Sequence, residues 1–201
     1  MMHLNLSDVL NNPKLLTFKV SLPSGETITL RPLEHSDISS LAQFLEKLSP
    51  KTRQYYILDS YNFSTAEELC DAINRYDKLR FIAEDNSAKN FVALFEFSFD
   101  IPKNDEERFL RYGVKLNPKT DCRIGLCIAD EYQNKGIGSL FFPYLLGIAK
   151  LFGQKRMILW GGVFAINKRA LKFYEKNGFK KLGVFNNKNG GESIDMMIFK
   201  A

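Results

Sequence analysis

Hydrophobic and polar positions alternate along the first part of the chain as they do in paired strands. Residues 15–33 alternate around a Pro-Ser-Gly-Glu turn, and Pro and Gly supply the turn dihedrals between β-branched neighbours. This pattern predicts an N-terminal hairpin over about residues 14–32. Residues 36–49 then repeat apolar side chains at helical spacing, which predicts a helix capped by Ser36 or Asp37.

The middle of the chain predicts two more helices, two strands and a long loop. A short helix is expected over residues 50–58, and another from the STAEEL cap near Ser64. Residues 79–84 and 91–99 predict strands joined by a polar Asp-Asn-Ser turn. Residues 100–120 are polar and contain two prolines, so we expect a long loop there with at most a short edge strand.

The last part of the chain alternates strands with helices. Strands are predicted over 122–129 and 156–162, a helix over 167–178, and a closing hairpin over 179–200. Between the first two strands, an apolar-periodic helix begins at about residue 136, and Pro143 inside it predicts a kink or loosened turn over residues 139–143. The chain has no repeat or linker, so a single mixed α/β domain is expected over residues 1–201.

Composition narrows the protein class. No stretch approaches the roughly 20 apolar residues of a membrane helix, and the start lacks the order of a signal peptide, so a cytoplasmic protein is expected. Cys70, Cys122 and Cys127 show no CxxC spacing. We therefore expect buried reduced thiols, with no disulfide framework and no metal site.

Positive charge is concentrated in residues 150–181. This range contains nine Lys and Arg residues, and Glu175 is its single acidic residue. Such a surface attracts a polyanionic ligand, although a solvated helix face with excess lysine explains the charge equally well. No aromatic-rich RNA motif accompanies the charge, which makes nucleic acid a weaker candidate partner.

Residues 131–142, EYQNKGIGSLFF, place two glycines at the start of the apolar helix. A helix N-terminus offers unpaired N–H groups and the positive end of the dipole. Gly136 and Gly138 let a phosphate approach the backbone, and Lys135 adds charge. The loop lacks the Lys-Ser or Lys-Thr of a P-loop, and Phe141 stands where a dinucleotide fold has its third glycine.

Gln133 to Gly138 resembles the Q/R-x-x-G-x-G/A signature of the GNAT superfamily of N-acetyltransferases, which binds the pyrophosphate of coenzyme A. Ile128 holds the hydrophobic position five residues before the glutamine, and Tyr132 stands where the family often has an aromatic. Residues 167–179 resemble the family's N-x-x-A…Y-x-x-x-G-F block, and residues 28–56 are similar to its first strand and helices. The resemblance covers roughly residues 25–200.

The second block also has a physical reading of its own. Asn167 can cap the helix and Gly178 can close it in the left-handed conformation. Asn167 and Tyr174 are seven residues apart, about two turns, so both lie on one side of the helix. They can point at one ligand channel, or Asn167 can merely cap while Tyr174 merely packs.

The resemblance implies an acetyl-CoA-dependent N-acetyltransferase (EC 2.3.1.-) with a twisted mixed sheet of six or seven strands, splayed between strands 122–129 and 155–161. Acetyl-CoA would enter the splay, with its pantetheine bonded to the backbone of Leu126 and Ile128. The pyrophosphate would sit on the amides of residues 134–139. The implied coenzyme A-binding residues are Leu126, Cys127, Ile128, Gln133, Asn134, Lys135, Gly136, Ile137, Gly138, Ser139, Asn167 and Tyr174.

The implied chemistry is direct attack of a neutral amine on the thioester. A backbone N–H near Ile128 would stabilise the oxyanion, and Tyr174 would protonate the departing thiolate. The general base stays open. Glu96 is the candidate, acting through a water, because a carboxylate among phenylalanines binds a proton more readily; an ordinary outward-facing strand residue is the alternative. His3 and His35 are expected at the surface or in a cap.

The acceptor also stays open between a small-molecule amine and a protein lysine or N-terminus. Residues 49–63 and 100–120 are expected to select it, and the acidic residues of 100–107 would suit a cationic acceptor, although a solvated loop explains them too. Monomer and homodimer both remain open. A non-catalytic acyl-CoA sensor and a basic nucleic-acid-binding module are the two alternatives of other classes.

Overall fold

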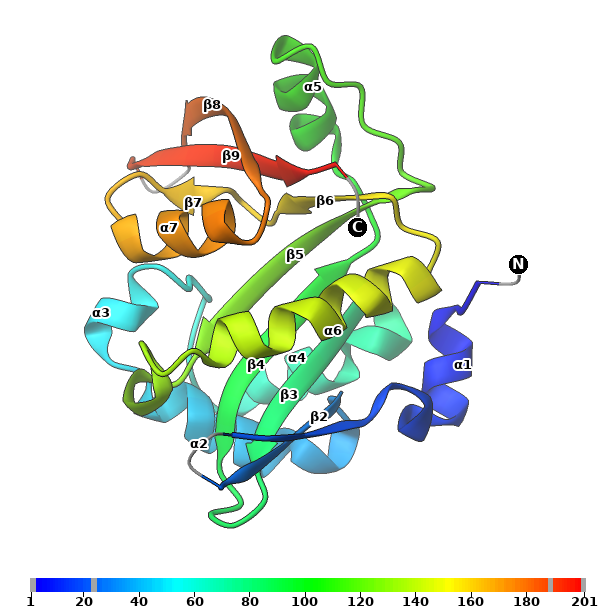
Figure 1. Ribbon diagram of the computed structural model, residues 1–201, viewed down its shortest axis with the longest axis vertical. Helices are drawn as coiled ribbons and strands as arrows, with labels where there is room; N and C mark the ends of the chain where they lie inside the picture. Colours follow the sequence, from blue (N-terminus) through cyan, green and yellow to red (C-terminus); the bar gives the residue numbers. More distant parts are fainter. Residues whose placement is uncertain (1–2, 23–24, 188–189, 200–201) are drawn as a thin grey trace. The chain divides into compact units, whose positions relative to one another are not determined.

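The computed structural model describes residues 3–22, 25–187 and 190–199 (Figure 1). The chain divides into two compact units. The first, called the N-terminal unit, contains residues 4–96 and 126–137. The second, called the C-terminal unit, contains residue 3, residues 97–125 and residues 138–199. The single domain over residues 1–201 therefore stays a prediction.

The N-terminal unit begins with a helix and the predicted hairpin. After α1 (Leu6–Asn11) and a 3-10 turn, β1 (Phe18–Ser21) pairs antiparallel with β2 (Thr27–Pro32), which confirms the hairpin. Two of the predicted turn residues, 23 and 24, lie outside the described residues. The sheet continues from β2 to β3 (Lys78–Asp85) and then β4 (Phe91–Ser98), so both strands predicted in this region are confirmed.

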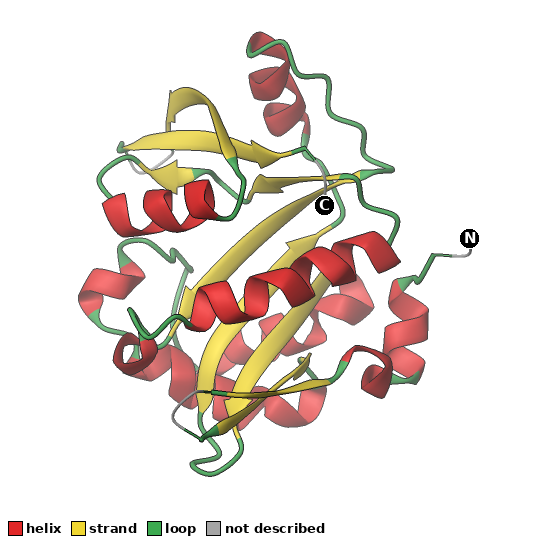
Figure 2. Ribbon diagram, in the orientation of Figure 1, coloured by secondary structure: helices red, strands yellow, loops and turns green. Residues whose placement is uncertain are grey.

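Three helices follow the hairpin in this unit: α2 (Ile38–Lys47), α3 (Pro50–Arg53) and α4 (Phe63–Arg75). The apolar stripe predicted for α2 is buried, and α2 packs against α4, which packs on β3 (Figure 2). α3 is shorter than the predicted 50–58. The chain leaves the helix after Gln54, where the Tyr61 hydroxyl donates to the Tyr56 carbonyl and lies 3.1 Å from the Arg53 carbonyl.

The C-terminal unit is built on the remaining strands. Its elements, some of which extend beyond it, are β5 (Asp121–Ile128), α6 (Ile137–Leu151), β6 (Arg156–Leu159), β7 (Val163–Phe164), α7 (Lys168–Lys176), β8 (Lys180–Asn186) and β9 (Glu192–Ile198). β5 and β6 are parallel, whereas β9 pairs antiparallel with β6, β7 and β8. The mixed sheet and the closing hairpin are therefore confirmed.

Two details of this unit bear on the predicted splay. The parallel ladder joins Asp121–Ile124 to Arg156–Leu159 and ends where β6 ends, while β5 continues to Ile128. The described ranges contain nine strands rather than six or seven, because the two-residue β7 and the N-terminal hairpin add to the sheet. α6 continues through Pro143 as one helix, and a kink there stays a prediction.

The prediction of a long loop over residues 100–120 is wrong, because this segment contains a helix, α5 (Lys103–Arg111). Pro102 precedes the helix and acidic residues occupy its first turn, which suits the helix dipole. Arg108 anchors the helix by donating to Asp105 at 2.8 Å and to Asp195 of β9 at 3.1 Å. Asp195 is 0% exposed, so a buried ion pair between residues distant in sequence stabilises α5.

The packing of Tyr112 after α5 makes Gly183 sensitive to substitution. A Cβ on Gly183 would lie 2.1 Å from Tyr112 Cε1, and the Tyr112 hydroxyl is bonded to Asp195 at 3.1 Å. We expect Gly183→Ala to lower the free energy of unfolding by about 1–3 kcal/mol through overpacking. Gly147→Ala on α6 is the control in denaturant unfolding, because its Cβ would meet nothing within 4 Å. Equal stability of the two variants would contradict the prediction.

Candidate active site

The glycine motif forms a tight loop between β5 and α6. A 3-10 turn over Asp130–Tyr132 follows β5, and α6 begins at Ile137. Asn134 and Gly136 have positive φ values of 63° and 80°. A Cβ on Gly136 would meet nothing within 4 Å. The left-handed backbone, and not crowding, is therefore what favours glycine at this position.

Gln133 ties this loop to the end of β5. Its Nε2 donates to the Ile128 carbonyl at 2.9 Å and to Thr52 Oγ1 at 3.0 Å. The Lys135 ammonium lies 5.3 Å from the centre of the Tyr132 ring, within the range of a cation–π contact. The structure thus brings Ile128, Gln133 and Lys135 together in the N-terminal unit, with Leu126 and Cys127 immediately before them on β5.

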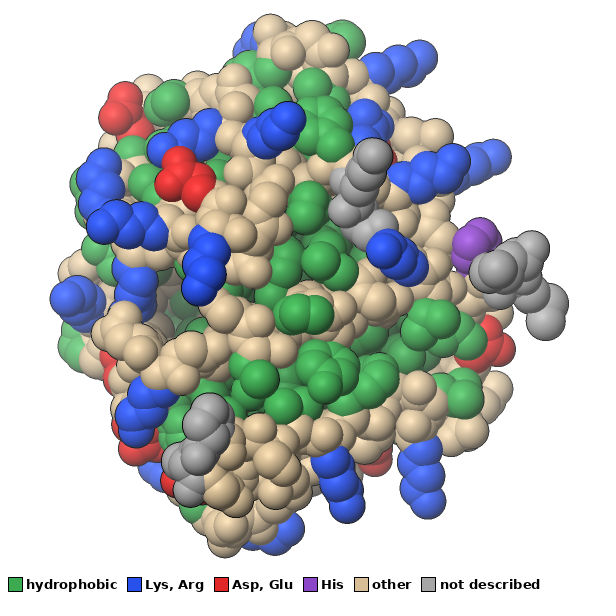
Figure 3. Space-filling view, viewed as in Figure 1, with side chains coloured by type: hydrophobic (Ala, Val, Ile, Leu, Met, Phe, Trp, Pro, Cys, Tyr) green, Lys and Arg blue, Asp and Glu red, His purple; other side chains and the backbone are tan. Residues whose placement is uncertain are grey.

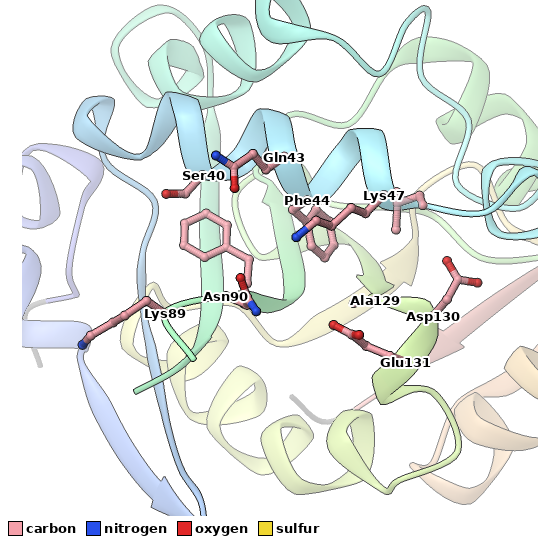
Figure 4. A pocket seen from close by; sticks show the side chains of 11 residues that line it. Ser40, Gln43, Phe44, Lys47, Lys89, Asn90, Ala129, Asp130 and Glu131 are labelled. Atoms are coloured by element: carbon pink, nitrogen blue, oxygen red, sulfur yellow. The ribbon is translucent and has the colours of Figure 1, made fainter. Parts of the chain in front are cut away.

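A pocket of about 260 Å³ lies beside the start of this loop, within the N-terminal unit. α2 forms one wall, the turn between β3 and β4 forms another, and Ala129, Asp130 and Glu131 close it (Figure 4). Hydrogen bonds from Ser49 fix the side chain of Asp130. Its carboxylate accepts from the Ser49 backbone N–H at 2.8 Å and from the Ser49 hydroxyl at 2.6 Å. Thr52 Oγ1 donates to the same carboxylate at 2.7 Å. Sequence reasoning missed this anchor.

Glu96 lies in the interior and is only 6% exposed, so the outward-facing alternative is wrong. Its surroundings are polar rather than purely aromatic. Oε2 accepts from Arg80 Nε at 2.6 Å and Oε1 accepts from the Tyr56 hydroxyl at 2.6 Å. Removal from water, and then the charge of Glu96, raise the pKa of Tyr56 well above its usual range. Tyr56 is therefore a proton donor to Glu96 at neutral pH.

Asn167 and Tyr174 belong to α7 in the C-terminal unit. Asn167 Oδ1 accepts from the Ala170 N–H at 3.1 Å, which confirms the predicted cap, and Gly178 has the expected positive φ of 91°. Tyr174 is 8% exposed, and its ring contacts Phe173 and Phe179 edge-on at 5.1 and 5.2 Å. Burial raises the pKa of its hydroxyl.

The Tyr174 hydroxyl has no hydrogen-bond partner within residues 3–22, 25–187 and 190–199. A phenol that stays protonated and has no partner can donate its proton to a ligand. Ser139 and Gly138, the other predicted ligands of this unit, lie in the first turn of α6. The predicted site residues therefore form two groups, one in each compact unit.

The three cysteines are buried thiols, as predicted. Burial raises the pKa of Cys70 to about 12, and it also raises the pKa of Cys122. Thiols that hold their protons so firmly are poor nucleophiles. Neither of these two residues therefore provides a nucleophile for the reaction.

The basic side chains of the C-terminal third are largely solvated. Figure 3 shows Lys and Arg side chains gathered over α7, with an acidic group among them. Glu175 pairs with Lys181 at 2.8 Å, and both side chains are nearly half exposed. No helix in the described part of the chain has the length and apolar character needed to cross a membrane.

Residues 80–181, just over half of the chain, match the model of the acetyltransferase (GNAT) domain. This chain belongs to the GNAT family. The matched range includes Glu96, β5, the glycine loop and α7, so the resemblance found in the sequence is confirmed. The protein is accordingly an acetyl-CoA-dependent acetyltransferase (EC 2.3.1.-) rather than a non-catalytic acyl-CoA sensor.

A curated relative agrees with the family assignment, and two solved structures share the fold. The chain is 27% identical over 137 residues to an acetyltransferase of Pseudomonas aeruginosa, covering 68% of this chain and 67% of the relative. The GNAT domain of PAT from S. lividans is 17% identical with a TM-score of 0.69, covering 92% and 98% of the two chains. Spermidine N-acetyltransferase from Vibrio cholerae, in complex with CoA and spermine, is 22% identical with a TM-score of 0.64, covering 86% and 95%. Both structures show the GNAT fold.

Proposed function

We propose that this GNAT acetyltransferase transfers the acetyl group of acetyl-CoA to a primary amine by direct attack in a ternary complex. The amine belongs to a small molecule or to a protein lysine or N-terminus. The observation that best supports acetyl-CoA binding is the conformation of the loop of residues 133–137. Its left-handed residues Asn134 and Gly136 lie directly before the N-terminus of α6. A loop that turns backbone N–H groups toward one point at a helix N-terminus suits a pyrophosphate.

The end of β5 suits a pantetheine chain. The Ala129 N–H donates to the Val92 carbonyl of β4 at 2.9 Å, and backbone groups alternate in direction along a strand. The N–H of Ile128 therefore points away from β4, and Leu126 has the same direction. The Ile128 carbonyl already accepts from Gln133, which leaves the Ile128 N–H to face the thioester and stabilise an oxyanion. Cys127 completes this stretch, and Ile137, Gly138 and Ser139 extend the pyrophosphate contact.

Tyr174 is the proposed general acid, and Asn167 is the proposed second contact of α7 with the donor. Because burial raises the pKa of Tyr174, the hydroxyl is protonated at neutral pH and can donate to the departing thiolate. The same shift leaves almost no phenolate at neutral pH, so Tyr174 is not available as a base. Proton donation in the forward reaction therefore agrees with the environment of this side chain.

Glu96 is the proposed general base. Arg80 and Tyr56 occupy one lone-pair position on each carboxylate oxygen, and a carboxylate has about four such positions. Capacity therefore remains for a water that relays the proton from the amine. Tyr56 itself lies in the segment of residues 49–63 that is expected to select the acceptor.

The acidic residues of 100–107 support a cationic acceptor less than their sequence suggests. Asp105 is bonded to Arg108 at 2.8 Å, and Asp100 accepts from Arg123 at 2.9 Å. These two carboxylates each pair with an arginine of the same unit, so they are not free to bind a cationic acceptor. Selection of the acceptor is therefore better sought in residues 49–63 than in α5.

Thermal unfolding with acetyl-CoA tests the proposal. A ligand at 100 times its dissociation constant adds about 2.7 kcal/mol to stability, which for a chain of this size corresponds to a rise of roughly 5–10 °C in melting temperature. We expect that rise with acetyl-CoA and none with acetate alone. A melting temperature that does not change would overturn the proposed donor site. Release of CoA with a panel of small amines and lysine peptides would then identify the acceptor class.

A further inference from the structure

The segment formed by α3 and the residues after it is hydrogen-bonded both to the proposed acetyl-CoA-binding loop and to Glu96, the proposed general base. Thr52 is buried, and its Oγ1 accepts from Gln133 Nε2 at 3.0 Å while it donates to Asp130 at 2.7 Å. Gln133 opens the glycine loop, and Asp130 lies beside the pocket in Figure 4. The hydroxyl of Thr52 is thus bonded to two residues of the segment that joins β5 to α6. All three residues belong to the N-terminal unit.

The other end of the same turn leads to Glu96. The Tyr56 N–H donates to the Thr52 carbonyl at 3.0 Å, one helical turn away. The Tyr56 hydroxyl then donates to Glu96 Oε1 at 2.6 Å, and Arg80 fixes the opposite oxygen. A displacement of Thr52 therefore moves Tyr56, because the two are joined by one backbone hydrogen bond and by a chain segment with three intervening residues. The path from Gln133 to Glu96 is continuous in hydrogen bonds and covalent bonds.

We propose that Thr52 is a positioning residue that couples acetyl-CoA binding to the geometry around Glu96. The proposal rests on the proposed function, because it takes residues 133–137 as the donor loop. A ligand held by this loop restricts the motion of Gln133. Because Gln133 is hydrogen-bonded to the Thr52 hydroxyl, the motion of Thr52 and of the following residues 53–62 is restricted too. Coupling between two sites is reciprocal, so an ordered acceptor segment also favours the donor loop in its binding conformation.

Thr52→Val removes the hydroxyl at nearly constant volume. Gln133 keeps its bond to the Ile128 carbonyl, and Asp130 keeps both bonds from Ser49. The variant therefore retains the main anchors of the loop. Thr29→Val is the matched control, because Thr29 is also buried in the same unit and its hydroxyl bonds to Asn86 at 2.8 Å, away from this path.

Hydrogen exchange of the whole protein, with and without acetyl-CoA, measures the coupling. In the wild-type protein we expect acetyl-CoA to slow exchange in peptides covering residues 130–137 and, by about 5-fold or more, in peptides covering 53–62. In Thr52→Val the protection of 130–137 remains, whereas that of 53–62 falls below about 2-fold. Thr29→Val should behave as the wild type, and Thr52→Ser should restore the remote protection because it keeps the hydroxyl.

Two outcomes separate this inference from the proposed function. If calorimetry detects acetyl-CoA binding but residues 53–62 gain no protection, or if Thr52→Val keeps the full effect, the coupling role of Thr52 is overturned while the donor site stands. If acetyl-CoA does not bind the wild-type protein at all, the proposed donor site fails and the inference fails with it.

Discussion

Tyr174→Phe is expected to lower turnover at least about 100-fold, the usual contribution of a positioned general acid, with acetyl-CoA affinity almost unchanged. The substitution removes one oxygen and keeps the ring, which packs against Phe173 and Phe179. Because no residue in the described ranges bonds to the hydroxyl, its loss leaves no protein partner unsatisfied. The effect should therefore fall on kcat rather than on stability.

CoA release, measured with whichever amine supports it, tests this result together with calorimetry of acetyl-CoA binding. Tyr144→Phe on α6 is the control, since it makes the same chemical change outside the proposed site. The pH profile adds a second readout. A raised pKa of Tyr174 means that the proposed acid keeps its proton through pH 8–9, so activity should not fall there through Tyr174 ionisation. Undiminished turnover in Tyr174→Phe would rule out this side chain as the acid.

The elements that the sequence predicted well are those whose signals are local. The Asn167 cap, the Gly178 terminus and the glycine loop each depend on residues within one helical turn or one tight turn. Local hydrogen bonds and left-handed glycines leave a readable spacing in the sequence. α1 had such a signal too, because Asn5 and Asp8 form a reciprocal capping box, and reading it would have found this helix.

α5 was missed because its stabilisation comes from far along the chain. Its own sequence is strongly polar, and the partner that fixes Arg108 is Asp195, 87 residues away. Propensity is a weak prior that tertiary contacts override. No spacing within residues 100–120 reports such a contact, so the segment resembled a solvated loop.

The surroundings of Glu96 were unpredictable for the same reason. Strand periodicity left its direction open, and its partners come from β3 and from the segment after α3. A buried carboxylate needs partners, but the sequence does not say which residues supply them. The chain of bonds from Gln133 through Thr52 likewise joins residues 81 apart, although the motif had already identified Gln133 as important.

Gly136→Val is expected to weaken acetyl-CoA binding about 10- to 100-fold, because one lost charge-assisted hydrogen bond is worth about 1.5–3 kcal/mol. Gly136 has a φ of 80°, and a β-branched residue avoids that region. Crowding at the Cβ is not the obstacle, since a Cβ there meets nothing within 4 Å. The loop must instead change its backbone conformation, which turns its N–H groups away from the positions proposed for the pyrophosphate.

Gly113→Val separates this effect from a general loss of stability. Gly113 has nearly the same φ, 76°, and its Cβ would also meet nothing within 4 Å, but it follows α5 and lies outside the proposed donor site. The strain of a left-handed residue, about 1–2 kcal/mol, should lower the free energy of unfolding similarly in both variants. Calorimetry should then show weakened acetyl-CoA binding in Gly136→Val alone. Equal affinities in the two variants would mean that the backbone of this loop does not hold the pyrophosphate, and that the donor's phosphates are bound elsewhere on the chain.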